Sequence, residues 1–265
     1  MGLMKSEQAI GVFDSGVGGL SVLAHIHTLL ANENLCYVAD SAYMPYGCKP
    51  ESMVEERSLK VTQFLAERPC KAIVVACNTA TAAAIHKLRG MYDMPVIGME
   101  PALKPAVGSS PAGLVGVLAT SGTISSDKFK QLKLRYAKDA ELIVQPCPGL
   151  VEEIEKGELG SERMLSLLGF YLKPLLECGV DTLVLGCTHY PFISPLIRRL
   201  VGESVTILDA GDAIARELYR QLELRSLLSL REEQGSLHFW KSGDGSADLF
   251  SRLWGKKVSV DQLDF

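Results

Sequence analysis

Two stretches of similar sequence decide the fold. Residues 73–79 are Ile-Val-Val-Ala-Cys-Asn-Thr, and residues 183–189 are Leu-Val-Leu-Gly-Cys-Thr-His. In each, a short apolar run ends in a cysteine and polar residues, and a helical pattern follows. Continuous apolar runs of this length are typical of parallel strands that are covered on both faces. We therefore predict an α/β protein built on parallel sheet.

The same alternation of apolar runs and helical patterns extends along most of the chain. After residue 209, residues 213–233 have apolar side chains at helical spacing, and residues 237–240 predict a strand before a final helix that ends at Trp254. We expect these last elements to return to the first half of the protein. The other predicted strands cover residues 10–13, 35–38, 72–75, 95–97, 114–118, 141–144, 182–185 and 205–208.

An internal repeat relates the two halves of the chain. Residues 10–16 resemble residues 115–122, and residues 73–79 resemble residues 183–189, in the same order and at nearly the same spacing. We therefore predict two similar α/β lobes that face one another. The segment 95–111, rich in Pro, Gly and small residues, is the expected crossing between them. The first lobe is predicted to comprise residues 1–97 and 210–265, and the second residues 98–209.

Composition and charge exclude several classes of protein. With 47% hydrophobic and 22% charged residues in 265, the chain has ordinary globular usage, which argues against disorder. A net charge of -4 argues against a strongly basic nucleic-acid binder. The longest uncharged stretch, residues 105–126, is interrupted by Pro and Gly, so we expect no membrane contact. Residues 1–10 lack a signal-peptide core, and the seven cysteines form no C-x-x-C pair, so we expect a cytoplasmic protein with reduced thiols.

Four side chains that carry chemistry lie at the carboxyl ends of predicted strands. They are Asp14, Cys77, Thr120 and Cys187. Ligands of open parallel sheets bind beyond the carboxyl ends of the strands, where these side chains are expected to meet. A thiol just before a helix lies near its positive end, which lowers the thiol pKa and favours the reactive thiolate. Polar residues follow Cys77 and Cys187 directly, whereas Cys36, Cys70, Cys147 and Cys178 lack such neighbours and are predicted to be structural.

Two loops and one histidine complete the candidate site. The Gly-rich turn 14–19 matches neither the dinucleotide-binding motif G-x-G-x-x-G nor the P-loop motif of nucleotide-binding proteins. The carboxylate of Asp14 in this turn is suited to bind an ammonium group. The loop 41–47 can present backbone amides to a carboxylate. Because closely spaced ligand pairs are absent from the sequence, we predict no metal site, and His189 is interpreted as an acid/base partner of Cys187. The remaining histidines, His25, His27, His86 and His238, are given no role.

Together these motifs resemble those of glutamate racemases, in the aspartate/glutamate racemase superfamily. The resemblance implies two pseudo-symmetric lobes with the active site in the cleft between them. It also implies interconversion of L- and D-glutamate without a cofactor, which supplies D-glutamate for peptidoglycan. The motifs that carry it are residues 11–19, 39–41 with 45–47, 76–80 and 185–191.

The resemblance also implies roles for individual residues. Cys77 and Cys187 become the two acid/base thiols, with Cys77 taking the proton from D-glutamate and Cys187 from L-glutamate. Asp14 and His189 become their helpers, and a supporting glutamate is expected at Glu155, with Glu152 as the alternative. The implied substrate-binding residues are Asp14, Ser15, Tyr46, Gly47, Asn78, Thr79, Thr120, Thr123, Thr188 and His189.

Other functions stay open at this point. A superfamily racemase for aspartate would keep both cysteines, whereas a hydrolase or decarboxylase would need one. A two-lobed ligand-binding protein would need neither. The predicted partner is a small-molecule substrate, glutamate, with no nucleic acid and no membrane, and a homodimer is the candidate assembly.

Overall fold

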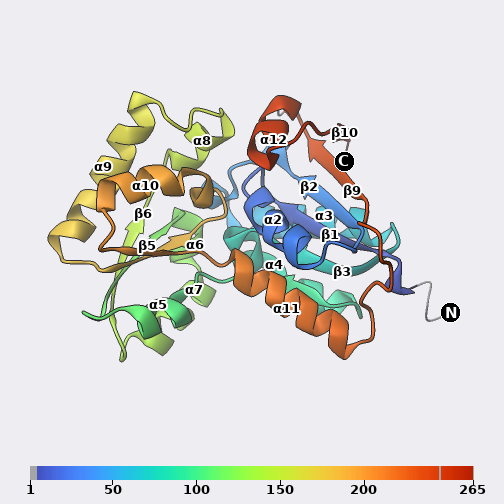
Figure 1. Ribbon diagram of the computed structural model, residues 1–265, viewed down its shortest axis with the longest axis horizontal. Helices are drawn as coiled ribbons and strands as arrows, with labels where there is room; N and C mark the ends of the chain where they lie inside the picture. Colours follow the sequence, from blue (N-terminus) through green and yellow to red (C-terminus); the bar gives the residue numbers. More distant parts are fainter. Residues whose placement is uncertain (1–4, 245, 265) are drawn as a thin grey trace. The chain divides into compact units, whose positions relative to one another are not determined.

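The computed structural model describes residues 5–244 and 246–264 (Figure 1). Residues 1–4, which belong to the segment considered above for a signal peptide, lie outside the described residues. The chain divides into two compact units. The first comprises Met1–Met99 and Gly211–Phe265, and the second comprises Glu100–Ala210. Each unit contains one parallel sheet, so the predicted α/β class is confirmed.

The first unit is organised around a sheet whose described strands are all parallel, in the order β10-β9-β2-β1-β3-β4. Apolar, largely buried runs form its centre, as expected for strands covered on both faces. The C-terminal segment returns to this sheet, because β9 pairs with β2. The strands are β1 (Ala9–Asp14), β2 (Leu35–Ala39), β3 (Cys70–Val75), β4 (Val96–Gly98), β9 (Leu237–Ser242) and β10 (Val260–Leu263).

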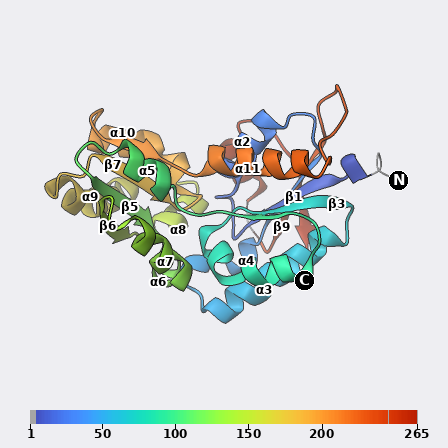
Figure 2. The ribbon, with the colours of Figure 1, turned by 90° about the horizontal axis from the view of Figure 1, so that it is seen from below.

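Helices cover both faces of this sheet. Figure 2 shows α3 (Glu51–Ala66) and α4 (Asn78–Met91) on one side, and α2 (Leu20–Leu29) and α11 (Gly211–Leu224) on the other. The short helix α12 (Ala247–Trp254) also contacts α2. This arrangement buries the strands and leaves their carboxyl ends to carry the candidate site.

The second unit has a smaller parallel sheet, in the order β6-β5-β7-β8. Its strands are β5 (Leu114–Ala119), β6 (Glu141–Pro146), β7 (Thr182–Gly186) and β8 (Thr206–Leu208). One apolar cluster joins this sheet to α8, α9 and α10, and another joins it to α5 and α7. The helices are α5 (Leu103–Ser109), α6 (Ser121–Ser125), α7 (Asp127–Tyr136), α8 (Leu150–Glu155), α9 (Glu162–Glu177) and α10 (Ser194–Val201).

The two sheets share one strand order. In the first unit β2, β1, β3 and β4 are neighbours, and in the second β6, β5, β7 and β8 occupy the same places. The repeated sequence motifs lie at equivalent positions, at the ends of β1 and β5 and of β3 and β7. The predicted pseudo-symmetry is therefore confirmed.

In the C-terminal region one predicted helix was too long, and one strand was missed. The predicted helix 213–233 ends at Leu224 as α11. Ser226 takes the left-handed conformation with φ 54°, and the Leu227 N–H donates to the Leu222 carbonyl at 2.8 Å, which closes the helix end. The strand β10 was not predicted, because Val260-Asp261-Gln262-Leu263 is an edge strand without an apolar run. No helix within the described ranges is long and apolar enough to cross a bilayer.

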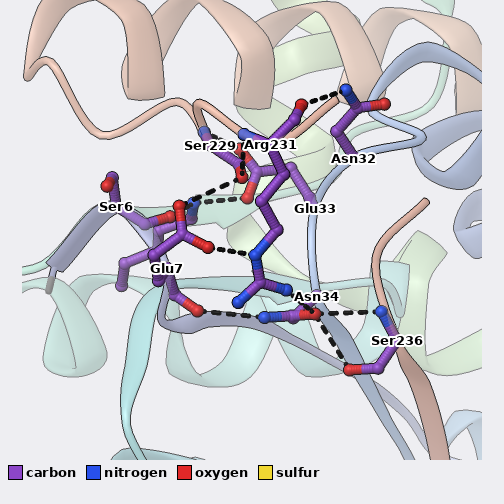
Figure 3. A network of polar contacts seen from close by, with 9 residues as sticks. Ser6, Glu7, Asn32, Glu33, Asn34, Ser229, Arg231 and Ser236 are labelled. Carbon is purple, nitrogen blue, oxygen red and sulfur yellow. Dashed lines mark hydrogen bonds and ion pairs between the residues drawn. The ribbon is translucent and has the colours of Figure 1, made fainter. Parts of the chain in front are cut away.

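A polar network attaches the segment after α11 to the first unit (Figure 3). The Ser229 N–H donates to Glu33 Oε1 at 2.8 Å. Arg231 pairs with Glu7 and donates from Nη1 to Asn34 Oδ1 at 2.8 Å. Asn34 Oδ1 also accepts from the Ser236 N–H at 2.9 Å, directly before β9. These contacts fix the point at which the returning chain enters the sheet.

Candidate active site

Cys77 lies between β3 and α4 and caps the helix. The Ala80 N–H donates to Cys77 Sγ at 3.4 Å, and Ser15 Oγ lies 4.0 Å from the same sulfur. The thiol is buried, 6% exposed, at the positive end of a fourteen-residue helix. A backbone donor and a helix N-terminus both favour the thiolate over the thiol. The structure therefore gives Cys77 the surroundings of a proton-transfer group.

Asp14, the last residue of β1, organises the turn beside Cys77. Its Oδ1 accepts from Ser15 Oγ at 3.0 Å and from the Gly16 N–H at 2.9 Å, and the residue is fully buried. Gly19 is required here, because a Cβ would lie 2.7 Å from Asp14 Cβ and 2.8 Å from Tyr37 Oη. Asp14 and Ser15 thus lie on the same side of the unit as Cys77.

Asn78 has a buried amide without a protein partner. It is 5% exposed, and among the described residues neither its Nδ2 nor its Oδ1 has a hydrogen-bond partner. Thr79, the next residue of α4, is buried beside it. A buried polar group without a partner costs about 1–3 kcal/mol, which a bound polar ligand can recover. Asn78 therefore indicates a ligand site next to Cys77.

Tyr46 and Gly47 lie in a short 3₁₀ turn, η2 (Tyr46–Cys48), of the loop after β2. The Tyr46 hydroxyl donates to Asp40 Oδ2 at 2.5 Å, and its ring is buried. Burial and the neighbouring Asp40 carboxylate raise the pKa of Tyr46 well above its ordinary value. The hydroxyl therefore stays protonated and is bound within the protein.

Cys187 follows β7 in the second unit. It is 7% exposed, and its carbonyl accepts from the Tyr190 N–H at 3.1 Å. Unlike Cys77, it does not directly precede a long helix: a 3₁₀ turn, η3 (Tyr190–Ile193), lies before α10. The prediction that a helix starts one or two residues after each thiol is therefore correct only for Cys77. Beside Cys187 lies the imidazole of His189.

His189 connects Cys187 to a carboxylate. Cys187 Sγ lies 3.7 Å from His189 Nδ1, and His189 Nε2 lies 2.7 Å from Glu155 Oε1. Burial lowers the pKa of His189, but hydrogen bonds to Cys187 and Glu155 and their charges outweigh it, so the pKa is raised well above its ordinary value. A protonated imidazole beside a sulfur stabilises the thiolate.

Glu155 is the last residue of α8, and Glu152 lies one turn earlier in the same helix. The structure places Glu155 against His189, whereas the charge of Glu152 acts on Tyr171 and Tyr190, raising the pKa of both phenols after the larger effect of burial. Between the two glutamates that the sequence left open, the geometry favours Glu155.

The remaining candidates of the second unit lie at strand ends. Thr120 caps α6: its Oγ1 accepts from the Thr123 N–H at 3.2 Å and lies 3.0 Å from Thr123 Oγ1. Thr188 is buried between Cys187 and His189. The structure thus groups Cys77, Asp14, Ser15, Asn78 and Thr79 in the first unit. It places Thr120 after β5, and Cys187, Thr188 and His189 after β7, in the second.

Sequence reasoning missed a thiol and a carboxylate near these groups. Cys147, predicted to be structural, is close enough for the charge of Cys187 to act on it, and burial together with that charge raises the pKa of Cys147 to about 12. It therefore stays a neutral thiol. Asp40 contacts Tyr46 but was not singled out as a site residue, although, like Asp14, it stands at the end of a buried strand. Within residues 5–244 and 246–264 there is no group of three His, Cys, Asp or Glu that could hold a metal ion.

Two units with the same strand order each carry a thiol after an equivalent strand, Cys77 after β3 and Cys187 after β7. The chain belongs to the Asp/Glu/Hydantoin racemase family, whose model matches residues 10–218. Recognition of the aspartate/glutamate racemase superfamily from the motifs is confirmed.

Within this family the chain is similar to glutamate racemases. It is 55% identical over 238 residues to the glutamate racemase of Methylococcus capsulatus, covering 90% of this chain and 88% of that protein. A glutamate racemase isoform from Bacillus anthracis has a similar structure, with a TM-score of 0.86, 33% identity and 98% of each chain covered. The Escherichia coli glutamate racemase, solved with L-glutamate and the activator UDP-MurNAc-ala, gives a TM-score of 0.84 and 32% identity over 97% of this chain and 98% of that one.

Proposed function

We propose that this protein is a glutamate racemase that interconverts L- and D-glutamate without a cofactor. The observation that carries the proposal is the pair of thiols at equivalent strand ends, Cys77 after β3 and Cys187 after β7. Inverting an α-carbon needs a base for one face and an acid for the other. Two thiols supply both, and they exchange roles when the reaction runs in the opposite direction.

In the proposed reaction one thiolate removes the α-proton and becomes a thiol. The electron pair of the broken C–H bond stays on the α-carbon and is delocalised into the α-carboxylate. The other thiol then donates its proton to the opposite face and becomes a thiolate. After one turnover the thiol that began as a thiolate is protonated, and the other has become a thiolate. No oxidant or reductant is consumed.

Each thiol has its own polar support for this chemistry. His189, held by Glu155, lies beside Cys187 Sγ and can exchange a proton with it. In the first unit Asp14 orients Ser15, whose hydroxyl lies 4.0 Å from Cys77 Sγ. The developing negative charge requires oriented donors near the substrate carboxylates.

Polar groups near the strand ends of both units are suited to bind the substrate. The orphaned amide of Asn78 is the clearest, because binding a carboxylate or ammonium group would satisfy it. We assign substrate contacts to Ser15, the Tyr46–Gly47 backbone, Asn78, Thr79, Thr120, Thr123 and Thr188. The L-glutamate bound in the Escherichia coli relative supports this substrate class.

We further propose a cytoplasmic role in supplying D-glutamate for peptidoglycan, with a homodimer as the assembly. The high identity to glutamate racemases supports the metabolic role. Sedimentation of the purified protein would test the assembly, since a monomer at all concentrations would contradict the dimer.

The activity is tested by incubating purified protein with L-glutamate in D₂O and following enantiomers by chiral chromatography. We expect D-glutamate with deuterium at the α-carbon, and no comparable reaction of L-aspartate. Release of ammonia or carbon dioxide would favour a hydrolase or decarboxylase, and binding without turnover would favour a ligand-binding protein. Reaction of aspartate alone would assign the other substrate.

The two-thiol mechanism is tested by substitution. Cys77→Ala and Cys187→Ala should each lower racemisation by at least about a thousandfold, because each removes one proton-handling group. Cys178→Ala, at an exposed thiol of the second unit, is the matched control and should keep activity within about threefold. Full activity in either active-site variant would exclude the mechanism.

A further inference from the structure

The loop that carries Tyr46 and Gly47 has little regular structure of its own. Two 3₁₀ turns, η1 (Ser41–Tyr43) and η2 (Tyr46–Cys48), make up most of it, and neither has a side-chain cap. Short 3₁₀ turns have poor hydrogen-bond geometry and are weakly stable alone. Its position must therefore come from contacts with the rest of the first unit.

Those contacts converge on Asp40, the residue between β2 and the loop. Its carboxylate is fully buried and accepts four hydrogen bonds. Tyr46 Oη and Arg57 Nε bind Oδ2 at 2.5 and 2.9 Å, and Arg57 Nη2 and Ser242 Oγ bind Oδ1 at 2.8 and 2.7 Å. Its own N–H donates to the Asp14 carbonyl at 3.0 Å.

Arg57 comes from α3 and pairs with Asp40 through two nitrogens. Its side chain is 3% exposed, and its guanidinium carbon lies 3.8 Å from the centre of the Tyr43 ring. Bidentate, charge-assisted bonds of this kind are both strong and directional. Arg57 therefore holds the loop at two points, through Asp40 to Tyr46 and through the ring of Tyr43.

The strand β9 holds the same loop from another side. Ser242 Oγ donates to Asp40 and accepts from the Ala42 N–H at 3.1 Å. Gly243 follows with φ 66°, and a Cβ there would lie 2.8 Å from Ala42 Cα. The loop is thus fixed by residues from α3 and from the C-terminal strand.

We infer that Asp40 and Arg57 are positioning residues that hold the Tyr46–Gly47 backbone for the substrate, and that the Tyr46 hydroxyl serves this framework and not the ligand. The inference rests on the proposed function for the identity of the substrate. Because the pair acts on how the loop is placed and not on proton transfer, it affects substrate binding in the ground state and the transition state alike.

The test uses Tyr46→Phe and Arg57→Lys in the full chain. Lysine cannot form the bidentate pair, and phenylalanine removes only the hydroxyl. We expect KM for glutamate to rise about tenfold in Arg57→Lys and about threefold in Tyr46→Phe, which corresponds to losing part of a charge-assisted hydrogen bond, with kcat within about twofold. A fall in kcat with unchanged KM, or no change in KM, would overturn the inference.

The matched control is Glu33→Gln, which breaks another buried ion pair of the same unit, to Lys71. It should lower the melting temperature without changing KM. A similar KM increase in this control would mean that general destabilisation, not loop position, is responsible.

A second measurement does not depend on the reaction. Hydrogen exchange of the peptide covering residues 41–48 should be faster in Arg57→Lys than in wild type or in Glu33→Gln. If wild type fails to racemise glutamate, the proposed function fails, and this exchange result alone decides whether the pair fixes the loop. Unchanged exchange would refute that role whatever the substrate.

Discussion

His189 makes the second unit sensitive to pH. Its folded-state pKa is raised above the unfolded value of about 6.5, so the stability it contributes is fully present below about pH 6.5 and is lost as pH rises through the raised pKa. We expect the unfolding free energy to fall above pH 6.5, with a maximal contribution to the slope of about 1.4 kcal/mol per pH unit. Urea unfolding at several pH values from 6 to 9 would measure how the unfolding free energy depends on pH.

The control is Glu155→Gln, which removes the carboxylate that faces His189 Nε2. The pKa of His189 then falls back toward its ordinary value, and the slope above pH 6.5 becomes shallower. An identical pH profile for wild type and this variant would show that the Glu155 contact does not raise the pKa of His189.

In the proposed mechanism the two thiols have different helpers, Asp14 for Cys77 and His189 for Cys187, and isotope effects distinguish them. Asp14→Asn weakens the group next to Cys77, so removal of the proton from D-glutamate becomes more rate-limiting. We expect the primary deuterium isotope effect to rise more with α-deuterated D-glutamate than with the L-form, and His189→Asn to give the reverse bias.

Comparing catalytic efficiencies in the two directions cannot replace this experiment. Enantiomers have an equilibrium constant of one, so any substitution lowers both efficiencies equally. If both variants shift the two isotope effects in the same proportion, the assignment of helpers is wrong, while the two-thiol mechanism survives.

Among the elements, the return of the chain from α11 to β9 depends on a buried charge. Lys71 on β3 pairs with Glu33 Oε2, and the side chains are 1% and 2% exposed. Glu33 also accepts from the Ser229 N–H, so one carboxylate joins β3 to the network of Figure 3. Breaking this pair leaves an ammonium group buried without its counterion.

Glu33→Gln should therefore lower the free energy of unfolding by about 3 kcal/mol at pH 7. Burial already lowers the pKa of Lys71, and loss of Glu33 lowers it further. Because the neutral amine is then favoured in the folded state, the deficit should shrink as pH rises from 7 toward 10. Denaturant unfolding at several pH values would check this, and a deficit that grows with pH would contradict it.

The central strands could be predicted from the sequence because their local apolar pattern agrees with their buried position in the fold. The runs at β1, β3, β5 and β7 are apolar, bounded by turns and buried on both faces, so local pattern and tertiary position agree. The end of α11 was not predictable in this way. A left-handed Ser226, and not a glycine, closes the helix, and the apolar spacing continues past it.

The candidate site was predictable in its strand-end residues and not in its framework. Asp14, Cys77 and Cys187 lie at the carboxyl ends of strands, so their place follows from the topology. The pairing of Asp40 with Arg57 depends on which face of α3 packs against β1 and β3, and the bond from Ser242 joins residues about 200 apart in sequence. Contacts of this kind cannot be predicted from local sequence patterns.

For the whole molecule, the two units differ in how continuous they are. The second unit is one segment of chain, whereas the first needs residues from both sides of it. Pairing β2 with β9 closes a loop of about 200 residues, which is slow compared with local pairing. We expect β5 and β7 to gain protection from hydrogen exchange before β9 during refolding, as pulse labelling with mass spectrometry would show. Simultaneous protection would indicate a single cooperative step.

The late position of β9 has a consequence during synthesis on the ribosome. When β2 has been made, about 200 residues must still be translated before its partner emerges, roughly 10 to 40 seconds at ordinary elongation rates. Throughout that interval the edge of β2 that pairs with β9 is open, and the carboxylate of Asp40 lacks Ser242. The nascent first unit therefore exposes an open strand edge that favours aggregation, and a stop codon anywhere before β9 would leave an aggregation-prone fragment instead of a smaller enzyme.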